Sequence, residues 1–353
     1  MSEFTHLIDQ AQALRVFVGQ VTDGPEFLEI VARSMTIASL LVLVGGSAFV
    51  MVVWWPVIDS DASAGDVARS FARRARRIGT SAWLGAVAGT AASLLLIVRT
   101  NADEAGMSSL LAFTSEVVVA SRPVLSTLLR LLGLALVAAL WTSSVGRRSL
   151  LEMRSSSAHR RSYAFTIVVV TALALGLLTT AGLSGHAAER SPAAVNVAAS
   201  ALHLGAAACW IGGLLMLVFV VYPATSSLSR RHRVRVLAPT VSRFSSMAVV
   251  AVGLLVASGS FRSWAEVRTV GALTATAYGL ALVMKVAAFA PMIGLGGFNR
   301  FWLKPRLERA AASPDARGAP VVSFRRLMSI ELALAAAVLA LTAALTSFSP
   351  PAR

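Results

Sequence analysis

The sequence predicts an all-α membrane protein, a polytopic bundle of eight transmembrane helices with both chain ends on the outer side. Hydrophobic residues make up 56% of the 353 residues and charged residues only 14%, which is more apolar surface than a soluble domain can bury. The apolar residues gather in windows of about 20, the length of a membrane-spanning helix. The arginines gather in alternate connections between those windows, and this pattern predicts the orientation.

Eight apolar segments are expected to span the bilayer. Each is predicted to be helical because unsatisfied backbone groups are not tolerated in lipid, and their frequent Gly, Ala, Ser and Thr suit close helix packing. The segments are residues 33–56, 78–98, 121–141, 163–185, 194–222, 243–261, 276–297 and 328–348.

The chain divides into three parts around these segments. Residues 1–30 contain several acids and lack the basic start and apolar core of a signal peptide, so we expect an external amphipathic segment. Residues 31–180 contain the first four helices. Residues 181–353 contain the last four helices and the connection that precedes them.

Basic residues predict which side each connection occupies. They are concentrated in the connections at 57–77, 142–162, 223–242 and 298–327, whereas the other connections are poor in them or balanced by acids. By the positive-inside rule, these four connections face the cytoplasm. Topology therefore explains the net charge of +15, and the predicted partner is the bilayer of the cell membrane, not nucleic acid.

Several classes of protein are excluded. The connections are too short to fold as domains, and the chain has no P-loop, dinucleotide fingerprint or nucleophile elbow, so no enzyme is predicted. The single cysteine, Cys209, excludes an intrachain disulfide and a cysteine-based zinc cluster.

His203 is the most informative polar residue because it lies inside the apolar segment 194–222, roughly 10 Å below the outer surface at 1.5 Å per residue. Helical spacing places it on one face with Asn196, Ser200, Ala207 and Trp210, which predicts the wall of a cavity that opens outward. Cys209 falls on a different face and is a poor co-ligand.

The other histidines differ in their predicted positions. His186 lies at the outer end of segment 163–185 and, together with His203, is the predicted pair of metal ligands. His6 is external and a weaker candidate. His159 and His232 fall in arginine-rich connections and are expected to be solvated.

Further polar and sulfur-containing residues are expected to support this site. Arg130 and Lys285 occupy the same outer layer, and charged residues in membranes normally face the bundle interior or water. Met35 and Met284 offer thioether sulfur, which suits Cu(I). Glu331, near the cytoplasmic end of the last helix, is expected to pair with Arg300 or Arg326.

The second half of the chain resembles a known family. "GHAAER" (185–190) and "ALHLGAAACWIGGLL" (201–215), followed by "RFSSMAVVAVGLLVASGSFRSW" (243–264), "AYGLALVMKVAAFAPMIGLGGFNRFWLKP" (277–305) and "FRRLMSIELALAAAVLALTAALTSFSPP" (324–351), are similar in order and spacing to blocks of the copper-resistance protein D (CopD) family. The resemblance covers residues 180–351 well, whereas residues 30–180 match mainly in helix pattern.

The resemblance implies an eight-helix inner-membrane protein of copper uptake or homeostasis. The residues that fall on its motif positions are His186, His203, Trp210, Gly212, Gly213, Lys285, Asn299, Arg300 and Glu331. The predicted function is copper acquisition or transport across the cytoplasmic membrane, with copper of either oxidation state captured by His186 and His203. No periplasmic metal-binding domain is fused here, so copper is expected from an extracytoplasmic copper-binding protein or as the free ion.

Two alternatives stay open. The first is a copper-delivery or assembly factor for a membrane oxidase, which would bind copper without transporting it. The second is a haem-binding membrane redox protein, because histidines are also haem ligands. The sequence does not distinguish these functions, and it does not indicate an oligomeric state.

Overall fold

The computed structural model describes residues 24–59, 65–104, 122–142, 157–182, 193–267, 271, 273, 276–313 and 321–345. Every regular element in these residues is helical, so the predicted all-α class is confirmed. Seven helices of the described part are long and apolar enough to cross a bilayer. The chain is therefore a multi-pass membrane protein.

The elements include long helices and three five-residue π-helical segments. In chain order they are α2 (Gly24–Phe49), η1 (Val50–Trp54), α3 (Trp55–Asp59), α4 (Gly65–Glu104), α6 (Arg122–Thr142), α8 (Ser157–Gly182), α9 (Ala193–Met216), η3 (Leu217–Val221), α10 (Tyr222–Ala224), α11 (Arg230–Val267), α13 (Ala277–Phe298), η4 (Asn299–Leu303), α14 (Lys304–Ala312) and α15 (Val321–Leu345).

Each of the first seven predicted spans overlaps one of the seven long apolar helices. The eighth predicted span, residues 328–348, overlaps α15, which is helical but is not among those seven. The count of eight spans is therefore not confirmed and remains a prediction.

Several helices begin earlier than predicted. α4 begins at Gly65 instead of residue 78, and α11 begins at Arg230 instead of residue 243, so the expected connections 57–77 and 223–242 are partly helical. The physical reason is that hydropathy marks only the apolar part of a helix, whereas arginine is a good helix former and lets the helix continue beyond it. Residues 24–30 likewise belong to α2, while residues 1–23 of the expected external segment lie outside the described residues.

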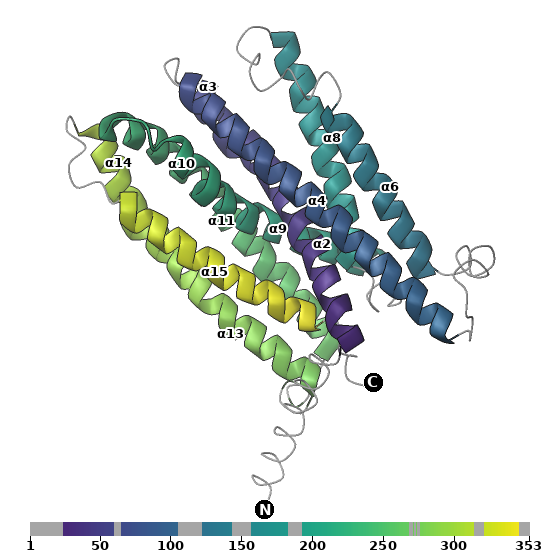
Figure 1. The fold of residues 1–353 in the computed structure, drawn as a ribbon. Helices are drawn as coiled ribbons and strands as arrows, with labels where there is room; N and C mark the ends of the chain where they lie inside the picture. Colours follow the sequence, from purple (N-terminus) through teal and green to yellow (C-terminus); the bar gives the residue numbers. More distant parts are fainter. Residues whose placement is uncertain are drawn as a thin grey trace, which may run out of the picture.

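α2 lies at the centre of the bundle. It packs against α4, α8 and α9, and to a smaller extent against α15. In Figure 1, α6 and α8 lie on one side of it, and α13 and α15 lie on the other. The start of α2 and the end of α15 lie at the same end of the bundle, and α3, α10 and α14 lie at the opposite end (Figure 1).

The three π-helical segments share a cause. Each is followed two residues later by a proline, namely Pro56, Pro223 and Pro305. Proline has no N–H, and its ring clashes with the carbonyl four residues earlier, so a wider turn relieves the clash. The residue at that earlier position is turned outward in every case, because Val52, Phe219 and Phe301 are all more than half exposed.

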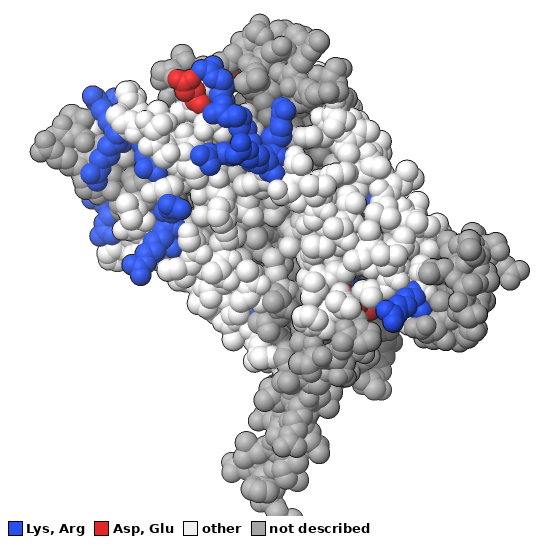
Figure 2. All heavy atoms as spheres, viewed as in Figure 1, with Lys and Arg blue, Asp and Glu red and all other residues white. Residues whose placement is uncertain are grey.

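The surface of the bundle fits a lipid environment. Large apolar side chains such as Leu95, Leu132 and Phe165 are about 70% exposed, the reverse of what a water-soluble bundle shows. Most of the Lys and Arg residues visible in Figure 2 gather at the end of the bundle where α3, α10 and α14 lie. This clustering fits the predicted arginine-rich side, although the side itself remains a prediction.

Candidate functional site

His203 lies half-buried on α9 and faces α11. Its Nδ1 is 3.0 Å from Ser258 Oγ, and Ser258 Oγ donates its own proton to the Leu254 carbonyl. A hydroxyl has one proton, so in the tautomer that keeps the bond from Ser258 to Leu254, Nδ1 donates to Ser258 Oγ. The neutral ring then carries its free lone pair on Nε2, which is the nitrogen left to bind a metal.

Positive charge surrounds this imidazole. The cations that act on His203 are Lys285 of α13 and Arg262 of α11. Arg262 donates to Ser200 Oγ, one turn before His203 on α9, at 2.9 Å. Ser200 and His203 thus both face α11. The outward-opening cavity predicted from this helix face stays a prediction.

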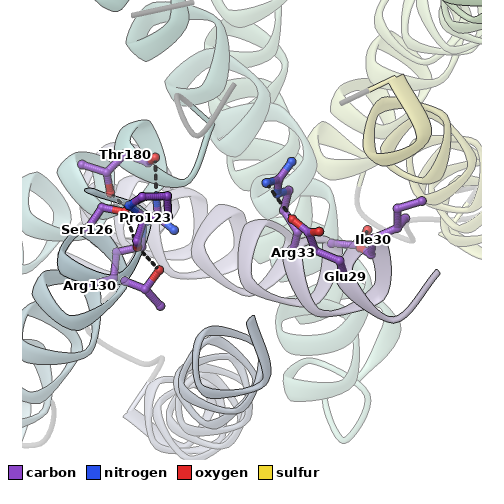
Figure 3. A network of polar contacts seen from close by, with 9 residues as sticks. Glu29, Ile30, Arg33, Pro123, Ser126, Arg130 and Thr180 are labelled. Atoms are coloured by element: carbon purple, nitrogen blue, oxygen red, sulfur yellow. Dashed lines mark hydrogen bonds and ion pairs between the residues drawn. The ribbon is translucent and has the colours of Figure 1, made fainter. Parts of the chain in front are cut away.

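Arg262 was missed by sequence reasoning because it falls at the boundary of the expected connection 262–275. The available signal was its spacing, since Arg262 follows Ser258 by four residues and therefore lies on the same face of a continuous helix. Arg130, the other predicted cation, lies elsewhere. It donates to the Thr180 carbonyl at 2.7 Å and to Thr180 Oγ1 at 3.3 Å, a contact between α6 and α8 (Figure 3).

The remaining predicted site residues are only partly described. His6 and His186 lie outside the described residues. Asn196 is half-buried near the start of α9, and Met284 is half-buried next to Lys285 on α13. Met35 is exposed on α2, close to Gly85 of α4.

No group of three or more His, Cys, Asp and Glu residues that could hold a metal occurs within the described part of the chain. A metal ion bound to His203 therefore needs further ligands of another type or from outside the described residues. His186, which lies outside them, is the predicted second ligand. Cys209 is half-buried on α9 and packs against the apolar core, in agreement with its expected packing role.

A second polar cluster lies deeper in the bundle, around Glu331 of α15. Its carboxylate is 1% exposed and accepts hydrogen bonds from Trp210 Nε1 of α9 and Asn299 Nδ2 of η4, each at 3.1 Å. The expected ion pair of Glu331 is wrong. Arg300 instead donates to Ser245 Oγ of α11 at 3.0 Å, and Arg326 is exposed.

Neutral donors explain this arrangement physically. Trp210 N–H and the Asn299 amide solvate the carboxylate without burying a second charge, which would carry its own desolvation penalty. Asn299 Oδ1 is buried and has no hydrogen-bond partner, so the cluster retains one unused acceptor.

Two helix faces connect the clusters. On α9, seven residues separate His203 from Trp210, about 10 Å along the axis. On α13, helical spacing puts Lys285, Phe289, Met292 and Gly296 on one face, and this face continues to Asn299. The Phe289 ring meets Trp210 edge-on at a centroid distance of 5.6 Å. The two helix faces therefore meet at Trp210, which belongs to the Glu331 cluster.

Comparisons with known proteins found similarity to a family model in the second half of the chain, and to two relatives over about half of its length. Residues 238–345 match the model of the family described as copper resistance protein D. The chain is 34% identical over 178 residues to the copper transport protein CutJ of Bacillus subtilis (strain 168), covering 50% of this chain and 30% of that protein. It is 33% identical over 189 residues to copper resistance protein D of Pseudomonas syringae pv. tomato, covering 52% of this chain and 60% of that protein.

The chain thus spans less than two thirds of the length of either of these relatives. No solved structure matches significantly. The matched residues 238–345 contain Ser258, Arg262, Lys285 and Glu331, which interact with α9. They also contain Asn299, which bonds to Glu331. Residues 238–345 are therefore similar to the copper resistance protein D family, and about half of the chain is similar to the two relatives.

Proposed function

We propose that this protein transports copper across the cytoplasmic membrane and takes the ion up at His203. The observation that carries the proposal is the bond between His203 Nδ1 and Ser258. It fixes the ring on α11 and leaves Nε2 as the lone-pair nitrogen, as second-shell partners do for metal-binding histidines. The names of the two relatives, a copper transport protein and a copper resistance protein, support copper as the cargo.

His186 is the proposed second ligand, with His6 or a methionine such as Met35 or Met284 completing the coordination. Imidazole binds both copper oxidation states and thioether favours Cu(I). Two cations beside His203 oppose long residence of another cation, and conduction requires sites that release the ion readily. Copper is supplied by an extracytoplasmic copper-binding protein or as the free ion.

The deeper cluster extends this path. Trp210 lies about 10 Å further along α9 than His203. It donates to Glu331 of α15, which is the buried acid that an ion leaving His203 meets next in this proposal. Close packing of Gly212 and Gly213 on the same helix permits the helices to approach below the uptake site.

The test is copper uptake into proteoliposomes that contain a copper-sensitive dye. His203→Ala is expected to lower the initial uptake rate at least about tenfold, which is the usual lower range for loss of a metal-site residue. The matched control is His232→Ala, because His232 is an exposed histidine near the start of α11 whose side chain hydrogen-bonds to Ser229. It is expected to leave uptake unchanged.

Two outcomes would contradict transport. Copper that binds to the outside of the vesicles and never reaches the dye would indicate a delivery or assembly factor. A Soret band in the purified protein that is lost in His203→Ala would indicate a haem protein.

A further inference from the structure

A groove lies between α2, α4 and the end of α9, away from both polar clusters. Its volume is about 570 Å³. Ala38 and Val42 of α2, Ile78 of α4 and Phe219 of η3 make its walls mostly apolar, and Arg74 and Arg77 of α4 line it as well. Phe219 is the residue that the π-helical segment η3 turns outward.

The groove follows the first part of α4. Its inner limit lies where α2 and α4 touch, because a Cβ on Gly85 would meet Ser39 Oγ of α2, and Ser39 also lines the groove. The α4 residues that line the groove run from Arg74 to Ala82, about 12 Å along the helix axis. This length fits within one leaflet of a hydrocarbon core of about 30 Å. Arg74 and Arg77 precede the predicted apolar span 78–98, so we expect them near the headgroups.

Arg74 and Arg77 are one helical turn apart and both border the groove. Neither makes a hydrogen bond or ion pair with another residue in the part of the chain that the structure describes, whereas Arg69 on the same helix is paired with Asp66. They lie in the part of α4 that precedes its apolar span, and most visible basic residues gather at one end of the bundle (Figure 2). Guanidinium groups bind phosphate through paired N–H donors.

We propose that this groove binds an anionic phospholipid. The headgroup phosphate lies on Arg74 and Arg77, and one acyl chain lies along α2 and against Phe219. The charge of the two arginines selects an anionic headgroup, and the apolar walls favour a lipid with an acyl chain over a free phosphate. This site is separate from His203, and its test does not depend on copper.

The experiment is native mass spectrometry of the full chain in detergent, with phosphatidylglycerol or phosphatidylcholine of identical acyl chains added. Arg74→Gln with Arg77→Gln is expected to lower phosphatidylglycerol retention about tenfold, since each basic residue near an anionic headgroup contributes appreciably to binding. Val42→Trp fills the groove without changing charge and is expected to lower retention as well.

The matched control is Arg73→Gln with Arg76→Gln, which removes the same charge from the same helix. Arg76 interacts electrostatically with Tyr163 of α8. Neither Arg73 nor Arg76 lines the groove. This control is expected to retain phosphatidylglycerol like the unmodified chain. Size-exclusion chromatography establishes that each variant is folded, and Arg77→Gln alone takes the place of the double variant if that one does not fold.

Three results would overturn the proposal. Equal loss of phosphatidylglycerol in both double variants would mean that the basic surface attracts lipid without a site. Equal retention of phosphatidylcholine would mean that the headgroup is not recognised. Displacement of the lipid by inorganic phosphate would mean that the arginines bind a free anion.

Discussion

Helices α2, α4, α6 and α8 are held together differently from helices α9, α11, α13 and α15. In the first set, polar side chains mostly bond to their own helix, as Thr36 does to Ala32 and Thr90 to Ala86. In the second set, side chains bond across helices, as in His203 with Ser258 and Trp210 with Glu331.

The difference indicates a division of labour. Lipid supplies little hydrophobic force between helices, so association depends on close packing of small residues or on polar contacts. The first set relies on packing, for example where Gly89 of α4 meets Thr36 and the Ala32 carbonyl of α2. The second set contains the polar groups on which the proposed copper site depends, and it includes the residues that match the family model.

The largest effect is expected where the two sets meet, at the contact of α2 with α9. A Cβ on Gly212 would lie 2.7 Å from Gly45 Cα and 3.0 Å from the Leu41 carbonyl oxygen, and these backbone atoms cannot yield. Gly212→Val is therefore expected to destabilise the fold by about 3 kcal/mol, measured by SDS-induced unfolding in mixed micelles.

The control for this variant is Gly253→Val on α11, because a Cβ there meets no other atom within 4 Å. It should unfold close to the unmodified chain. If Gly212→Val were equally stable, α2 and α9 would not be in close contact, and the two sets of helices would be independent units.

A smaller loss of stability is expected at the polar cluster around Glu331. Glu331→Ala leaves the Trp210 N–H and the Asn299 amide without their acceptor, which is expected to cost about 2 kcal/mol in the same unfolding measurement. Glu331→Gln should cost much less. The new amide can accept from Trp210. It can also donate to Asn299 Oδ1, which has no partner in the unmodified chain, after the Asn299 amide group flips by 180°.

Glu308→Ala is the matched control, since Glu308 lies on α14 with an exposed side chain and an ion pair to Lys304. Its removal is expected to change stability by less than about 1 kcal/mol. An equal effect of Glu308→Ala and Glu331→Ala would show that cross-helix polar contacts do not stabilise the second set.

The sequence predicted helix positions well because hydropathy responds directly to the lipid that surrounds each span. It predicted helix ends poorly. Hydropathy marked the apolar span from residue 78, but nothing in it indicates that α4 already begins at Gly65. Periodicity also predicted the inward face of α9 at Ser200, His203 and Trp210. Periodicity does not identify the opposing helix, and so Arg262 was missed and Glu331 was assigned to arginines instead of Trp210 and Asn299.

An effect on function is expected from Ser258→Ala. Losing the partner of Nδ1 lets the His203 ring turn and change tautomer, so copper affinity is expected to fall about tenfold, measured by competition with a chelator. The control is Ser246→Ala on the same helix, because Ser246 is exposed and bonds only to its own helix at Ser242. Unchanged affinity in Ser258→Ala would remove the main support for His203 as the uptake residue.

The smallest effect is expected in the first set, at the bond from Trp83 Nε1 of α4 to the Leu134 carbonyl of α6. Trp83→Phe removes this cross-helix bond and keeps an aromatic ring in place, so the expected loss is about 0.6 kcal/mol, the average for such bonds in a membrane protein. Trp264→Phe is the control, because Trp264 is 74% exposed on α11 and should change stability even less. A loss in Trp83→Phe as large as that in Glu331→Ala would mean that polar contacts hold both sets of helices. In that case the bond from Arg130 of α6 to the Thr180 carbonyl of α8 would be the next cross-helix contact of the first set to remove.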